Sequence, residues 1–207
     1  MDPSEKYWDK IAAKYARSPI ADQAAYEKKL DITRSHMRPD MEVLELGCGT
    51  GSTAILHAPY VKHIRATDIA QNMIDIAREK ARDAGVTNVT FEHIAIDDLN
   101  QPDASLDMVL GLSILHLLDD WREVIADVHR MLKPGGTFIT STACLGGGMT
   151  VMKPIIALGR LLGFFPTVKF FTQNELRAAM RDAGFEIVHD WHPGGMKALF
   201  LVARKPG

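Results

Sequence analysis

Apolar residues along this chain follow two patterns, short continuous or alternating runs and longer stretches with helical spacing. The spacing predicts helices over 52–57, 72–84, 121–132 and 172–184. Between them lie five runs with the length of strands: 43–46, 64–68, 89–94, 106–110 and 137–142. Strands that alternate with helices indicate a parallel sheet with helices on both faces.

The two ends of the chain add to this α/β core. Two further strands are predicted over 185–190 and 198–202, and the connection between them is too short for a crossover, so they form an antiparallel hairpin. Helical spacing over 4–17 and 22–36 predicts two N-terminal helices before the first strand. We therefore expect a seven-stranded, mostly parallel sheet with an antiparallel C-terminal hairpin strand and an N-terminal helical cap.

The length of 207 residues suits a single domain, 1–207, with one core. Within it the pattern indicates four parts: the helical cap (1–40), a ligand-binding core (41–142), an apolar insertion (143–171), and the last helix with the strand hairpin (172–207). The insertion contains glycines, prolines and three basic residues, so it does not read as a membrane span. It could cover the core, act as a lid over an apolar ligand, or contact a membrane surface or a second subunit through 149–171.

The first strand runs into a glycine turn, Val43-Leu44-Glu45-Leu46-Gly47-Cys48-Gly49-Thr50-Gly51. Glycine permits a positive φ and lets a ligand approach the backbone without meeting a Cβ. Asp68 ends the second strand, and parallel strands bring their carboxyl ends to one edge of the sheet. A carboxylate there accepts hydrogen bonds from both hydroxyls of a ribose, so we expect a ribose-bearing ligand.

Two nucleotide sites are disfavoured by the same residues. The dinucleotide fingerprint Gly-x-Gly-x-x-Gly fails because Ser52 stands at the sixth position, and no Gly-Lys-Ser/Thr follows to make a phosphate loop. Glu45, two residues before the first glycine, would repel a pyrophosphate but suits a cationic ammonium or sulfonium.

With these residues in place, the chain resembles the class I S-adenosylmethionine-dependent methyltransferases, whose fold is Rossmann-like. The resemblance covers roughly residues 41–142 and rests on motifs in family order: residues 43–51, Thr67-Asp68-Ile69 with Asn72-Met73, Ile96-Asp97-Asp98-Leu99, Ser105-Leu106-Asp107-Met108-Val109 and Leu132-Lys133-Pro134-Gly135-Gly136.

The resemblance implies S-adenosyl-L-methionine as cofactor and a role for each matching residue. Gly47, Cys48 and Gly49 would pack against its methionine part, Glu45 would lie near its amino group, and Asp68 would bind the ribose. Ile69 and Met73 would cover the adenine. Many relatives end the third strand in an acid, and here Ala95 takes its place, so the adenine contact is expected from Ile96 and Asp97. Gly111 and Leu112 would line the methionine end, and Tyr15 could reach the ligand from the cap.

Methyl transfer from a sulfonium is a direct in-line displacement in which the protein mainly positions the nucleophile. His116, just after the fourth strand, is the candidate general base if the acceptor must lose a proton. The apolar insertion favours a small, apolar or amphipathic acceptor. The alternative is a protein that binds the cofactor without methyl transfer, with a regulatory or interaction role.

Charge and cysteine usage limit the partners. Lys and Arg total 24 against 26 Asp and Glu, a net charge of −2, so nucleic acid is a poor default partner. The sequence Gly111-Leu112-Ser113-Ile114 also lacks the Asn/Asp-Pro-Pro-aromatic motif of methyltransferases that act on nucleic-acid bases.

Cysteine usage and the start of the chain bear on the compartment. With only Cys48 and Cys144, no disulfide framework or metal site is expected. No signal peptide is visible, so we expect a cytoplasmic protein.

Overall fold

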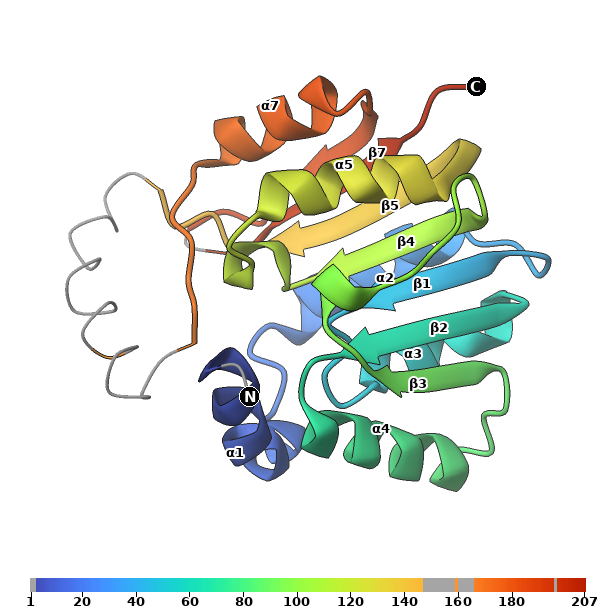
Figure 1. The fold of residues 1–207 in the computed structure, drawn as a ribbon, viewed down its shortest axis with the longest axis vertical. Helices are drawn as coiled ribbons and strands as arrows, with labels where there is room; N and C mark the ends of the chain where they lie inside the picture. Colours follow the sequence, from blue (N-terminus) through green and yellow to red (C-terminus); the bar gives the residue numbers. More distant parts are fainter. Residues whose placement is uncertain (1–2, 147–158, 160–165, 196) are drawn as a thin grey trace.

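The computed structural model describes residues 3–146, 159, 166–195 and 197–207. Its strands form one seven-stranded sheet in the order β3-β2-β1-β4-β5-β7-β6 (Figure 1). All neighbouring pairs from β3 to β5 are parallel, whereas β7 is antiparallel to both β5 and β6. The strands are β1 Glu42–Leu46, β2 His63–Asp68, β3 Val89–His93, β4 Leu106–Leu112, β5 Leu132–Thr142, β6 Glu186–Trp191 and β7 Leu199–Arg204. The predicted α/β fold is confirmed.

Helices cover both faces of this sheet (Figure 1). The described α-helices are α1 Pro3–Arg17, α2 Gln23–Ser35, α3 Ser52–His57, α4 Gln71–Asp83, α5 Trp121–Met131 and α7 Gln173–Asp182. Three short 3-10 helices are described: η1 Ala58–Tyr60 directly after α3, η2 Ile96–Asp98 after β3, and η3 Leu115–Leu117 after β4. Thr172 and Glu175 form a capping box at the start of α7.

Alternate residues of β1 enter two separate hydrophobic clusters, one on each side of the sheet. Leu44 and Leu46 pack in the cluster that includes α5 and α7 residues, and Val43 packs in the cluster on the opposite face. Glu45 follows the parity of Val43, so its side chain points to the second face. A carboxyl group is thereby held inside an otherwise apolar layer.

The two N-terminal helices take different positions. α1 packs beside α4, where Ala12 joins Met73 in a small apolar cluster near the carboxyl ends of the strands. α2 lies against the second face of the sheet, with Leu30 buried and Ile32 packed on the second cluster. The predicted cap is therefore α1, while α2 belongs to a layer of the fold.

Three strands extend at least two residues further than the sequence predicts. β4 continues to Leu112, β7 continues to Arg204, and β5 begins at Leu132, directly after α5, instead of at residue 137. Gly135, with a φ of 80°, lets the segment after Leu132 stay in the sheet. Its N–H donates to the Lys205 carbonyl at 2.9 Å, and the Lys205 N–H donates to the Gly136 carbonyl at 2.9 Å. The segment from Leu132 to Gly136, directly after α5, is thus the irregular start of β5.

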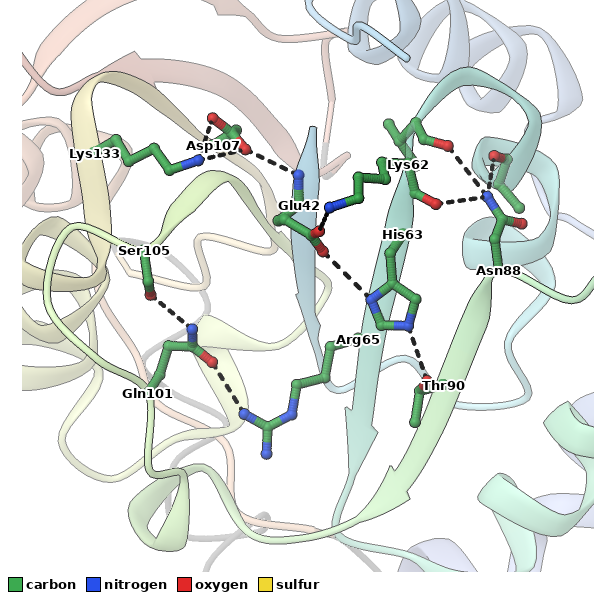
Figure 2. Close-up of polar contacts among 12 residues, drawn as sticks. Glu42, Lys62, His63, Arg65, Asn88, Thr90, Gln101, Ser105, Asp107 and Lys133 are labelled. Atoms are coloured by element: carbon green, nitrogen blue, oxygen red, sulfur yellow. Dashed lines mark hydrogen bonds and ion pairs between the residues drawn. The ribbon is translucent and has the colours of Figure 1, made fainter. Parts of the chain in front are cut away.

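Polar contacts at the amino ends of the strands hold this edge of the sheet together (Figure 2). The Asp107 carboxylate accepts a hydrogen bond from the Glu42 N–H at 2.9 Å, and Lys133 Nζ lies 2.9 Å from both of its oxygens. Asp107 and Lys133 therefore join β1, β4 and β5 at the edge opposite the glycine turn.

No helix in the described part of the chain is long and apolar enough to cross a membrane. The lid, membrane-contact and second-subunit hypotheses for residues 149–171 concern a segment of which only 159 and 166–171 lie within the described residues.

Candidate functional site

Two cavities meet at the carboxyl ends of β1, β2 and β4. The β2-side cavity, about 210 Å³, is lined by residues that follow β2, β3 and β4 and by α1. The α2-side cavity, about 610 Å³, lies between α2, the glycine turn and the ends of β4 and β5. Five residues line both and form the wall between them, which we call the shared wall: Tyr15, Gly47, Gly49, Leu112 and Ser113. This is the edge where α/β sheets bind ligands.

The glycine turn needs its first glycine for two reasons. Gly47 has a φ of 65°, which L side chains rarely adopt. A Cβ on Gly47 would also lie 2.6 Å from Ile114 Cδ1. The next residue, Cys48, donates its N–H to the Thr67 carbonyl at 2.8 Å, which fixes the turn to the end of β2. The turn therefore has no side chain at Gly47, and a ligand in the cavity can approach its backbone.

Asp68 connects the turn to the second strand. Its Oδ2 accepts a hydrogen bond from the Gly49 N–H at 2.8 Å, and its Oδ1 accepts one from the Ala70 N–H at 2.9 Å. Burial raises the pKa of Asp68, and these two N–H groups oppose that shift. Each carboxylate oxygen keeps a further lone pair toward the β2-side cavity, which Asp68 lines.

The other residues expected around an adenosine group also line the β2-side cavity. They are Ile69, Met73, Ile96 and Asp97. Met73 is buried on α4, while Ile96 and Asp97 form the short helix η2 directly after Ala95. Ala95 lines the cavity too, so the place of the missing acid faces the same space.

Glu45 brings a carboxyl group into the α2-side cavity. Its side chain is 2% exposed, and its Oε2 has no hydrogen-bond partner among the residues that the structure describes. Burial, with the nearby Asp68 charge, raises the pKa of Glu45 from 4.5 to about 8. A buried carboxyl oxygen without a partner fits a cationic ligand group, because an unpaired charge in such a place is costly.

Cys48 lines the same cavity beside Glu45. Burial raises the pKa of its thiol well above the ordinary value. The thiol is therefore held neutral and serves as a small packing group.

Polar groups cover the α2 side of the larger cavity. Lys29 Nζ donates to Ser141 Oγ at 2.8 Å, and the Tyr26 hydroxyl lies 3.2 Å from Thr53 Oγ1. From α4, Lys80 Nζ donates to Thr50 Oγ1 at 2.9 Å and to Ser52 Oγ at 3.0 Å, next to the glycine turn. A ligand in this cavity thus meets ammonium and hydroxyl groups as well as apolar side chains.

Two of the predicted site residues do not line either cavity. Gly111 is buried within β4, where a Cβ would lie 3.0 Å from the Phe138 ring. His116 lies in η3, and burial lowers its pKa to about 4. The imidazole is therefore neutral near pH 7.

Several lining residues were not anticipated. Ser113 has a φ of 64° and donates its N–H to the Ser141 carbonyl at 2.7 Å, which aims it at both cavities. No sequence signal marks a serine with this backbone conformation. Trp8 lines the β2-side cavity, and its spacing of seven residues from Tyr15 on α1 places both on one helix face. That spacing could have identified it.

Comparison with known proteins supports the same reading. Residues 43–136 match the family model described as a methyltransferase domain. The demethylmenaquinone methyltransferase of Listeria welshimeri is 31% identical over 224 residues, covering 97% of this chain and 95% of that protein. The chain belongs to the class I S-adenosylmethionine-dependent methyltransferases. The cofactor of this methyltransferase is S-adenosyl-L-methionine, as the motifs indicated.

Other similar proteins agree in fold and differ in extent. This chain is 33% identical to the uncharacterized methyltransferase YcgJ of Bacillus subtilis over 110 residues, which are 53% of this chain. It spans only 44% of that relative. The solved S-adenosylmethionine-dependent methyltransferase of Mesorhizobium loti covers 88% of this chain with a TM-score of 0.72, at 21% identity, and is itself covered to 99%. At that identity the likeness concerns the fold.

Proposed function

We propose that this methyltransferase moves a methyl group from S-adenosylmethionine to a small, apolar or amphipathic acceptor bound in the α2-side cavity. The observation that carries the proposal is the shared wall. A cofactor that fills the β2-side cavity and reaches across Gly47 and Leu112 would present its reactive end to a second compartment of about 610 Å³.

The residues around the β2-side cavity fit the cofactor. In our proposal the Asp68 carboxylate accepts hydrogen bonds from the ribose hydroxyls, and Ile69, Met73 and Ile96 pack against the adenine, beside Asp97. The methionine part extends past the shared wall into the α2-side cavity, where Glu45 Oε2, which has no hydrogen-bond partner among the described residues, is the acceptor for its ammonium. Gly47 and Gly49 let the backbone come close to that part, and Tyr15 covers it from α1.

When bound, the cofactor would supply a methyl group on a sulfonium, which a nucleophile would attack in line at carbon while the C–S bond breaks and the thioether leaves. The chain contributes by orienting the acceptor and excluding water, and positioning of this kind lowers a barrier by about 7–11 kcal/mol. A general base is needed only for an acceptor that arrives protonated. His116 keeps its predicted role as that base only if the site rearranges, because it lines neither cavity.

The lining of the α2-side cavity suits an acceptor with an apolar body and a polar group. Ile20, Ala25, Leu30 and Ala198 supply apolar surface, and hydroxyl and ammonium groups line the same cavity. The Listeria relative is named for demethylmenaquinone, so a quinol of that type belongs among the acceptors to be tested on this chain.

Two measurements test the proposal. Isothermal titration should show saturable binding of S-adenosylmethionine, and absence of heat at millimolar ligand would refute the cofactor site. Methyl transfer from labelled cofactor should then be screened against phenols, quinols, thiols, amines and amphipathic carboxylic acids. Binding without transfer to any of them would favour the alternative, a cofactor-binding protein with a regulatory role.

A further inference from the structure

Lys29 is the one residue of α2 that connects this helix to the end of β5 by a side-chain hydrogen bond among the described contacts. Its Nζ donates to Ser141 Oγ at 2.8 Å, across 112 residues of sequence, and both residues line the α2-side cavity. An ammonium has three donor hydrogens, and this bond uses one of them. The remaining donors are available to a ligand.

No carboxylate of the described residues forms an ion pair with Lys29. Asp22 is the carboxylate that acts on it electrostatically, but Asp22 Oδ2 pairs with Lys197 at 2.7 Å and its Oδ1 accepts the Ala25 N–H at 3.0 Å. Burial lowers the pKa of Lys29, which shows that desolvation of the charge is not fully compensated. A half-buried cation in this state gains from an anionic partner.

The position of Lys29 separates it from the expected ammonium site at Glu45. Glu45 lies opposite Leu110, and Leu110 lies opposite Ile139, two residues before Ser141. From ordinary strand spacing and rise, the Glu45 and Ser141 Cα atoms are about 12 Å apart. Because Lys29 contacts a strand two positions away from the strand of Glu45, we assign the ammonium at Glu45 and the anion at Lys29 to different ligands, and the second titration below tests that assignment.

Ser141 also borders the junction of the two cavities. Its carbonyl accepts the Ser113 N–H at 2.7 Å, and Ser113 belongs to the shared wall. An anion bound to Lys29 would therefore lie in the α2-side cavity next to the place where the two compartments meet.

We propose that Lys29 is the anion-binding residue of the acceptor cavity, and that the acceptor carries an ionised acidic oxygen, a carboxylate or phenolate, on its apolar body. The inference rests on the proposed function in that it takes the α2-side cavity as the acceptor site. Lys29 acts here as a positioning residue that holds the anionic oxygen and keeps it deprotonated.

Binding of 1-naphthoate and of its neutral analogue 1-naphthalenemethanol, with S-adenosylhomocysteine present, tests the anion site. The wild-type protein should bind the anion at least tenfold more tightly than the alcohol. Lys29→Met should remove that preference, and Lys29→Arg should restore most of it. Lys28→Met is the matched control, because Lys28 lies over the Trp191 ring on the same helix and lines neither cavity. An equal preference in wild type and K29M, or no preference in wild type, would overturn the proposal.

A second titration separates the two possible sources of the anion. S-adenosylmethionine should bind wild type and K29M equally. If K29M instead weakens S-adenosylmethionine tenfold and leaves its decarboxylated analogue unaffected, Lys29 holds the cofactor carboxylate and the acceptor assignment is wrong. The two proposals can also fail separately. If naphthoate is preferred only when Lys29 is present but no acceptor is methylated, the proposed methyl transfer is refuted and the anion site is supported.

Discussion

The Gly49 N–H donates a hydrogen bond of 2.8 Å to Asp68 Oδ2, so the glycine turn after β1 and the acid at the end of β2 form one unit. The Ala70 N–H donates to the other carboxylate oxygen at 2.9 Å. Asp68 therefore shapes the turn that approaches the ligand as well as offering lone pairs to it. Its removal should affect both functions together.

Asp68→Asn tests this double role. The amide keeps one oxygen acceptor and replaces the other by an NH₂ group, which cannot accept the Gly49 or Ala70 N–H. Hydrogen bonds to charged groups contribute about 1.5–3 kcal/mol, so we expect affinity for S-adenosylmethionine to fall roughly tenfold to a hundredfold. Titration calorimetry measures it. Asp75→Asn, on the exposed face of α4, should leave the affinity unchanged, and equal affinities for wild type and D68N would show that the ribose binds elsewhere.

Gly47→Ala and Gly85→Ala separate backbone strain from steric conflict. The two glycines have φ values of 65° and 66°. A Cβ at Gly47 would lie 2.6 Å from Ile114 Cδ1, whereas nothing lies within 4 Å of one at Gly85. We expect each variant to lose roughly 1 kcal/mol of stability from the left-handed conformation. Only G47A should also lose affinity for S-adenosylmethionine.

Thermal unfolding and titration calorimetry on both glycine variants provide the check. A loss of cofactor affinity in G85A equal to that in G47A would mean that general destabilisation, not the shape of the turn, controls binding.

The parts of the site that depend on local order along the chain could be predicted from the sequence. The strand, the glycine turn and Asp68 follow from an apolar run, glycine conformation and the rule that parallel strands end at one edge. The resemblance to the methyltransferase family implied an adenine contact for Ile96 and Asp97, and both line the β2-side cavity. Their contact with the cofactor stays a prediction.

Features that depend on distant residues could not be predicted. The bond between Lys29 and Ser141 joins a helix and a strand that are 112 residues apart, and no local pattern distinguishes Lys29 from Lys28. The early start of β5 is similar, since Gly135 and Gly136 form backbone hydrogen bonds with Lys205, which lies about 70 residues further along the chain. His116 was proposed as a base from its place after β4; it lines neither cavity, and its catalytic role stays a prediction.

His57 makes stability depend on pH on the acid side. It is fully buried, neither ring nitrogen has a partner among the described residues, and burial lowers its pKa from 6.5 to about 4. Between these two values the unfolded chain binds more protons than the fold, so the free energy of unfolding falls as pH falls through this window. The expected loss for this residue is about 2 kcal/mol between pH 7 and pH 5.

Urea unfolding of wild type and His57→Leu at those two pH values measures the effect of His57. The variant should lose less stability on acidification than wild type. Some dependence should remain, because burial also lowers the pKa of His116 to about 4. An identical loss in wild type and H57L would contradict the assignment.

Glu45 should make cofactor binding depend on pH below its pKa of about 8. Its pKa of about 8 means that the carboxyl is mostly protonated at pH 6–7 without ligand, and only the ionised form pairs with an ammonium. Binding should therefore strengthen by about tenfold per pH unit from pH 6 to 7.5, level off above pH 8, and release close to one proton at pH 7. Titration calorimetry in buffers of different ionisation enthalpy measures that proton.

Glu45→Gln should remove the pH dependence of cofactor binding and weaken binding at pH 8. Glu42→Gln is the control, because Glu42 lies on the same strand but pairs with Lys62 at the opposite edge of the sheet, and it should change neither the pH dependence nor the affinity. Affinity that is flat from pH 6 to 8 in the wild-type protein would mean that the cofactor's ammonium does not bind at Glu45.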